Sequence, residues 1–206
     1  RVDLARRLRG VTDIPPARTT PHNYMLGTRE LLWAQDISND RTIQVDAVLR
    51  GIGEHVYVWV DSTAQLTNAD AQILADNFDT QIYHQVRELW GTEASPGIDG
   101  DTRLHILAAH GLGNTVAAYF ASRHAYPEEI VGTSNEREMF FINLDGIGGD
   151  ITNILAHEFQ HMIRMNLDDD EETWLDEGFS TFTELYLGFD DNLWMAGSFF
   201  SNPGTQ

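Results

Sequence analysis

An HExxH motif lies in a segment of helical periodicity, Leu155-Ala156-His157-Glu158-Phe159-Gln160-His161-Met162. Apolar residues recur three and four positions apart around it, at Ile151, Ile154, Leu155, Phe159 and Met162. This spacing predicts an amphipathic helix over about 151–165. His157 and His161 are four positions apart, so they project from the same side of that helix, at the border between its core-facing stripe and solvent.

HExxH on a helix is what a hydrolytic zinc site requires. Two neutral imidazoles bind the metal from one helical turn, and the carboxylate of Glu158 reaches the zinc-bound water without itself being a ligand. Zinc lowers the pKa of that water towards about 7 and polarises the scissile carbonyl. Glu158 then acts as general base and hands the proton to the leaving amine. The alternative interpretation is an exposed helix face with two unrelated histidines.

A third ligand is expected downstream, because a catalytic zinc site takes three protein ligands and keeps one position open. The segment Trp174-Leu175-Asp176-Glu177-Gly178-Phe179 opens a second predicted helix over about 174–188. Glu177 and Glu184 share one face of it, and an antiparallel helix pair would bring Glu177 beside the histidines. Glu184 could accept the free ring N–H of a ligand histidine. The alternative for both is a solvated acidic residue. Apolar contacts of this helix are expected from Trp174, Leu175, Phe182 and Leu185.

Upstream of the motif the pattern changes to short strands. Alternating and β-branched residues predict two strands between about 41 and 60, and apolar runs predict strands at Leu104–Ala109 and Met139–Leu144. A helix is expected from Thr67 or Asn68 to about Leu89, with Ile73 among the apolar positions that follow its helical spacing. Residues 114–135 look rich in loops. We therefore expect an α+β fold, with an extended and β-rich region at 1–60 and a zincin-like catalytic domain at 61–206.

Composition excludes several classes of function. The 206 residues carry a net charge of -19, which repels phosphate backbones and argues against nucleic-acid binding. There are no cysteines, so zinc fingers, thiol catalysis and disulfides are excluded. No apolar run is long enough to span a membrane. The chain begins at Arg1 rather than Met, so we expect a piece of a longer precursor, with substrate-binding structure beyond Gln206.

Weaker signals concern calcium, the oxyanion and the substrate. The acidic run Asp168 to Glu172 has enough oxygen ligands for calcium but lacks an EF-hand pattern, so a solvated loop is the favoured interpretation. One of the strands Leu104–Ala109 and Met139–Leu144 is expected at the sheet edge, where it could pair with extended substrate. Candidate donors to an oxyanion are His110, His124, Tyr119, Tyr126 and Tyr186.

HEFQH followed by WLDEG resembles the gluzincin metallopeptidases, in which a Glu on the next helix is the third zinc ligand. WLDEGFST looks like the WLNEGF segment of the aminopeptidase N family, with Asp176 in place of Asn, but the amine-binding GAMEN signature of that family is absent. The chain is more similar to the hyicolysin-type family of secreted bacterial metallopeptidases. That resemblance covers roughly residues 55–190 and includes Asp99-Gly100-Asp101 and Arg137-Glu138-Met139-Phe140. It implies zinc ligands at His157, His161 and Glu177, with Glu158 as general base, and an extracellular location.

The sequence thus predicts a zinc-dependent peptidase that hydrolyses polypeptides. An endopeptidase is favoured, because the amine-binding signature of the aminopeptidases is missing. The alternatives are an exopeptidase with a different amine-binding device and a catalytically inactive, zinc-stabilised or metal-free binding module. The intact Glu158 argues against the binding module, because a structural metal site needs no general base.

Overall fold

Two apolar runs, at residues 104–109 and 139–143, form adjacent parallel strands in the interior of a mixed sheet. The computed structural model describes residues 16–146, 151–167 and 172–189. The strands are β1 (Arg29–Asp36), β2 (Arg41–Ile52), β3 (Val56–Asp61), β4 (Leu104–Ala109), β5 (Ala118–Phe120) and β6 (Met139–Asn143). The helices are α2 (Asn68–Asn77), α3 (His84–Trp90), α4 (Ile151–Leu167) and α5 (Thr173–Tyr186), with a π-helical segment η2 (Phe78–Tyr83) and short 3-10 turns η1 (Ile37–Asn39) and η3 (Ser122–Ala125). This mixture of helices and one sheet agrees with the α+β class.

The strand order is β1-β2-β3-β4-β6-β5. Strands β3, β4 and β6 are parallel, whereas β1, β2 and β5 join antiparallel. The boundary expected between residues 60 and 61 falls within β3, and strands from both sides of it share this sheet.

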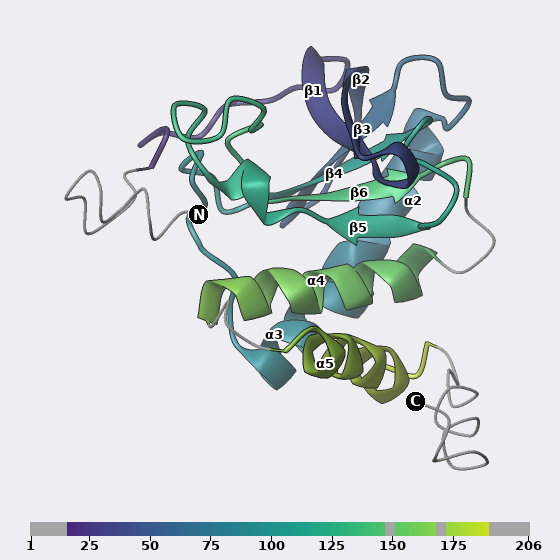
Figure 1. Cartoon of the computed structure of the whole chain (residues 1–206). Coiled ribbons are helices and arrows are strands. Elements are labelled where there is room, and N and C mark those ends of the chain that lie inside the picture. Colours follow the sequence, from purple (N-terminus) through teal and green to yellow (C-terminus); the bar gives the residue numbers. More distant parts are fainter. Residues whose placement is uncertain (1–15, 147–150, 168–171, 190–206) are drawn as a thin grey trace.

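Both faces of the central strands are buried, which explains their continuous apolar sequences. Alternate residues of β4 point to opposite faces: Ile106 packs on the helical side with Phe159 of α4, and Leu107 packs on the other side. The sheet curls, so β1 and β2 rise over the face opposite α4, as Figure 1 shows. Helix α4 lies directly under the sheet, and α5 lies against the outer side of α4 (Figure 1). No helix of the described residues has both the length and the apolar character that a bilayer span needs.

Local signals in the sequence placed several elements correctly. Thr67 caps α2 in a capping box with Asp70, and Gly91 follows the end of α3. The helix predicted over 151–165 is α4, and the one predicted over 174–188 is α5.

Two expectations, one about the sheet edges and one about exposure, were wrong. Neither Leu104–Ala109 nor Met139–Asn143 is an edge strand, because β5 and β1 occupy the two edges. Residues 114–135 are rich in loops as expected, and they also contain the short strand β5. Trp174, expected to supply apolar contact, is exposed, as is Ile73 in α2. Phe182 is partly exposed and contacts the ring of Trp90 as expected. Apolar side chains at helical spacing mark a helix, but sequence alone does not tell which of them the fold covers.

The second half of the β1 edge is closed by side chains. Asn135 bonds both backbone groups of Trp33: its Oδ1 accepts from the Trp33 N–H at 2.8 Å, and its Nδ2 donates to the carbonyl at 2.8 Å. The hydroxyl of Tyr119, on β5, accepts from the N–H of Gln35 at 2.8 Å. These contacts are possible because the curl brings β1 over the opposite end of the sheet. The second half of β1 therefore cannot add another strand.

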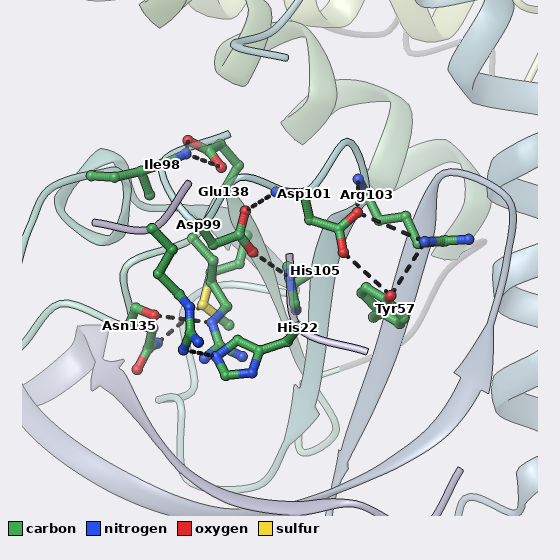
Figure 2. A network of polar contacts seen from close by, with 12 residues as sticks. His22, Tyr57, Ile98, Asp99, Asp101, Arg103, His105, Asn135 and Glu138 are labelled. Carbon is green, nitrogen blue, oxygen red and sulfur yellow. Dashed lines mark hydrogen bonds and ion pairs between the residues drawn. The ribbon is translucent and has the colours of Figure 1, made fainter. Parts of the chain in front are cut away.

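A buried polar network lies at the start of β4 (Figure 2). Oδ2 of Asp99 lies 3.2 Å from Nε2 of His105, whose Nδ1 accepts from Trp59 Nε1 at 3.0 Å. The carboxylate of Glu138 accepts from the N–H of Ile98 at 3.1 Å (Figure 2). The Asp99-Gly100-Asp101 segment is thus anchored to the sheet as a structural feature.

Candidate metal centre

Helix α4 carries the HExxH motif at the interface with α5. Its apolar stripe faces the sheet, where Leu155, Phe159 and Ile163 are completely buried. His157 and His161 lie on the flank of this stripe and are half-buried. The periodicity of α4 therefore presents both imidazoles to α5, as the sequence predicts.

Three side chains converge between the two helices. Nε2 of His157 lies 3.3 Å from Oε2 of Glu177, and Nε2 of His161 lies 3.7 Å from Oε1 of the same carboxylate. One donor atom from each of the three residues lies within 4.8 Å of the others. Within the described residues, this is the group of histidines and carboxylates whose spacing suits a metal ion.

The second ring nitrogen of each histidine faces another carboxylate of α5. Nδ1 of His157 lies 2.6 Å from Oε1 of Glu184, and Nδ1 of His161 lies 2.9 Å from Oδ2 of Asp176. A carboxylate at Nδ1 favours the tautomer with its proton there and leaves Nε2 free to bind a metal. The Glu184 contact was expected from its position on the face of Glu177. Asp176 was not identified from sequence as a partner of a histidine. Its position next to Glu177 in the helix could have indicated this role.

Glu158 is buried and points towards the sheet rather than towards α5. Its Oε2 accepts a hydrogen bond of 2.7 Å from the backbone N–H of Phe120, the last residue of β5. Burial raises the pKa of Glu158, more than the charges of His157 and His161 and this N–H lower it. A carboxylate with a raised pKa is a better proton acceptor near neutral pH.

The electrostatics of His157 reflect two opposed causes. Burial by itself lowers the pKa of this imidazole, but the hydrogen bond to Glu184 and the charges of Glu158, Glu184 and Glu177 together raise it above its ordinary value. The centre is therefore a strongly negative environment. Such an environment favours a bound cation.

A cavity of about 610 Å³ opens onto this cluster. One wall is formed by the edge strand and the residues beside it, including Val116, Ala118 and Phe120. The opposite wall continues along α4 past His161 to Arg164 and Met165. Arg164 was not identified from sequence as a residue of the site. Its position seven residues after His157, on the same helical face, could have indicated that it lines the cavity.

The oxyanion donors suggested by the sequence do not gather here. Tyr119 lines the cavity, but its hydroxyl is bonded to Gln35. His110 pairs with Asp145, and His124 is buried with its Nδ1 accepting the Asn135 N–H. Among the described residues, Tyr126 and Tyr186 do not line the cavity either. The acidic run suggested for calcium lies outside the described residues, except Glu172, which is exposed.

The donor set fits zinc. Two imidazole nitrogens and one carboxylate, each histidine backed by a further carboxylate, match the ligands and the outer contacts that catalytic zinc takes. Glu177 lines the cavity, and its side chain is 56% exposed. The geometry thus defines a candidate mononuclear metal centre on a helix pair beneath the edge of a sheet.

Comparison with known proteins supports a metallopeptidase relationship. The chain is 30% identical over 172 residues to the neutral metalloprotease ShpI of Staphylococcus hyicus. The match covers 72% of this chain and 37% of that relative, so the chain spans well under half the length of the protein it resembles. No protein-family model matches the chain.

Proposed function

We propose that this chain carries the catalytic centre of a zinc-dependent endopeptidase. One observation carries the proposal: His157 and His161 direct their Nε2 atoms at the carboxylate of Glu177 while their Nδ1 atoms are held by carboxylates. Such an arrangement is what a preformed three-ligand set with its supporting contacts would present, and this supports the proposal. The relationship to a neutral metalloprotease supports the same chemistry.

The residues around this set have distinct roles in the proposed reaction. Zinc held there would polarise the scissile carbonyl and acidify a water molecule. Glu158 would take the proton from the attacking water and transfer it to the leaving amine. Glu184 and Asp176 would hold the imidazoles in the orientation that presents Nε2.

The substrate would be an extended polypeptide bound along β5. This strand is an edge of the sheet and lines the cavity beside the cluster, which supports strand addition there rather than at β4 or β6. An open groove next to an edge strand accommodates an internal segment of a chain, and this favours an endopeptidase. An extracellular location fits such a substrate and rests on the family resemblance alone.

Digestion of casein by the parent protein and by Glu158→Gln, at matched zinc occupancy, tests the proposal. Glu158→Gln preserves the size of the side chain and removes its basicity. We expect cleavage at interior bonds by the parent and a loss of about 10²–10⁴-fold in the variant, with zinc content unchanged. Stepwise release from a chain end would indicate the exopeptidase instead. Equal cleavage by both proteins would exclude Glu158 as the base, and cleavage by neither would favour the binding module.

A further inference from the structure

The contact between β5 and Glu158 links the edge strand to the proposed general base. The pairing of β5 with β6 shows which backbone groups of β5 bond to β6 and which face away from it. The N–H of Asn143 donates to the carbonyl of Ala117 at 2.9 Å, so Ala117 and Tyr119 face β6. By the alternation of an antiparallel pair, the backbone groups of Ala118 and Phe120 face away from β6. The N–H of Phe120 is thus an outward-facing donor of a sheet edge, and Glu158 accepts it.

The two oxygens of Glu158 have different surroundings. Oε2 accepts the Phe120 N–H, whereas no described residue donates a hydrogen bond to Oε1. Glu158 also lines the cavity. One oxygen is therefore held by the rigid backbone of the sheet, and the other remains available to a reacting group. A glutamate has several rotatable bonds, so a single bond to a fixed partner removes much of its freedom.

We propose that the backbone N–H of Phe120 is a positioning group that fixes Glu158 for proton transfer and aligns it with peptide bound on the same strand. This inference rests on the proposed function. A substrate paired with β5 and the base held by β5 share one rigid reference, so their relative position does not depend on a flexible side chain. The strand would then contribute to the reaction through its backbone as well as to binding.

The backbone donor can be removed by Phe120→Pro. Proline is tolerated on edge strands where the lost N–H points away from the sheet, as here. Phe120→Ala is the matched control, since it removes the ring and retains the N–H. With casein and saturating zinc, we expect Phe120→Pro to lower kcat by about 10–100-fold relative to Phe120→Ala, with KM changed less than about threefold. In the Glu158→Gln background the same change should cost less than about threefold, because its target is already disabled. Equal kcat for the proline and alanine variants would overturn the proposal.

Amide hydrogen exchange tests the contact without relying on the proline variant or on activity. In the zinc-free full chain, Glu158→Ala should speed exchange of the Phe120 amide by about tenfold or more. The amide of Tyr119, which faces β6, is the internal control and should change less than about threefold. Unchanged exchange at Phe120 would overturn the proposal whatever the activity. If Glu158→Ala speeds exchange at Phe120 but the zinc-loaded parent cleaves no casein, the proposed function is overturned, and the positioning role with it. The hydrogen bond between Phe120 and Glu158 would still be established.

Discussion

Nδ1 of His157 lies 2.6 Å from Oε1 of Glu184, seven positions after Glu177 on the same helix. Two helical turns of α5 therefore supply both the carboxylate that faces Nε2 and the one that orients the ring from behind. The two roles are separable, because the contacts are made to different nitrogens of one imidazole.

Replacing Glu177 and Glu184 should distinguish these roles. Glu184→Gln should weaken zinc binding by about 10–100-fold, the usual range for a residue that orients a ligand. Glu177→Ala should weaken it by more than that range, since it removes a ligand. Competition with a chelating zinc indicator measures both affinities. Tight zinc binding by Glu177→Ala would mean that the third ligand lies elsewhere.

Asp176 should matter for zinc affinity although it is not expected to touch the metal. Its Oδ2 lies 2.9 Å from Nδ1 of His161, so Asp176→Ala should weaken zinc binding by about 10–100-fold. Asp145→Ala is a matched control, because Asp145 makes a similar contact of 2.7 Å with His110 outside the cluster. Equal affinities of the two variants for zinc would remove Asp176 from the site.

His124 should make the protein sensitive to acid. Burial, with the nearby charges of Arg123 and Arg137, lowers the pKa of His124 from 6.5 to about 3. The unfolded chain takes up a proton below pH 6.5 and the folded chain does so only near pH 3, so stability is lost as pH falls through this window. The loss from this residue is at most about 1.4 kcal/mol per pH unit.

Urea unfolding of the parent and His124→Asn at pH 7, 5 and 4 measures this contribution. The asparagine retains an acceptor for the Asn135 N–H and cannot titrate. We expect a shallower loss of stability with acid in the variant. Parallel pH profiles would show that other groups cause the acid sensitivity.

Glu138 should act in the opposite direction. Burial raises the pKa of Glu138 from 4.5 to about 7. Because the folded-state pKa is the higher one, its contribution is present below pH 4.5 and is lost as pH rises through about 7. Glu138→Gln retains an acceptor for the Ile98 N–H and removes the charge. The variant should therefore gain stability relative to the parent between pH 5 and pH 8, measured by urea unfolding. A difference in the free energy of unfolding that stays constant with pH would show that ionisation of Glu138 does not affect stability.

Asn135→Ala should destabilise the fold and open the edge at β1. The change removes both hydrogen bonds to Trp33 and leaves its backbone groups without partners, at a cost of about 1–3 kcal/mol. We also expect self-association, measured by light scattering, because an uncapped edge can pair with another copy. Asn114→Ala, in an exposed loop, is the control. Stability and scattering equal to that control would contradict the capping role.

The parts of this protein that sequence predicts are those encoded by local spacing. His157 and His161 could be paired from their separation alone, and Glu184 could be assigned from its place on the face of Glu177. The missed partner of Glu158 depends on long-range pairing. Phe120 reaches Glu158 only because β5 joins the sheet beside β6, and three residues of strand in a loop-rich segment give no periodicity to detect.

The edges of the sheet could not be predicted for the same reason. The sequences of β4 and β6 are continuously apolar because both faces of these strands are covered. Their position inside the sheet becomes clear only when the strand order is known. Trp174 illustrates a related limit, since it lies 72% exposed on a helix whose other face packs on α4. Helical spacing predicts which residues share a face, but the folded neighbours decide whether that face is covered.

The side-chain caps on β1 make the two edges of the sheet different for an approaching polypeptide. An extended chain that approaches the sheet at Trp33 meets the amide of Asn135 already in the place of a neighbouring strand. The same chain approaching β5 meets outward-facing backbone groups beside the histidine cluster, apart from the Phe120 N–H that Glu158 accepts. Under the proposed function, an extended substrate would therefore pair with β5, beside the histidine cluster, rather than with the second half of β1. The net charge of -19 on every copy would oppose pairing of that strand with a second molecule. The backbone of the sheet edges can thus select where an extended polypeptide binds, independently of pockets for its side chains.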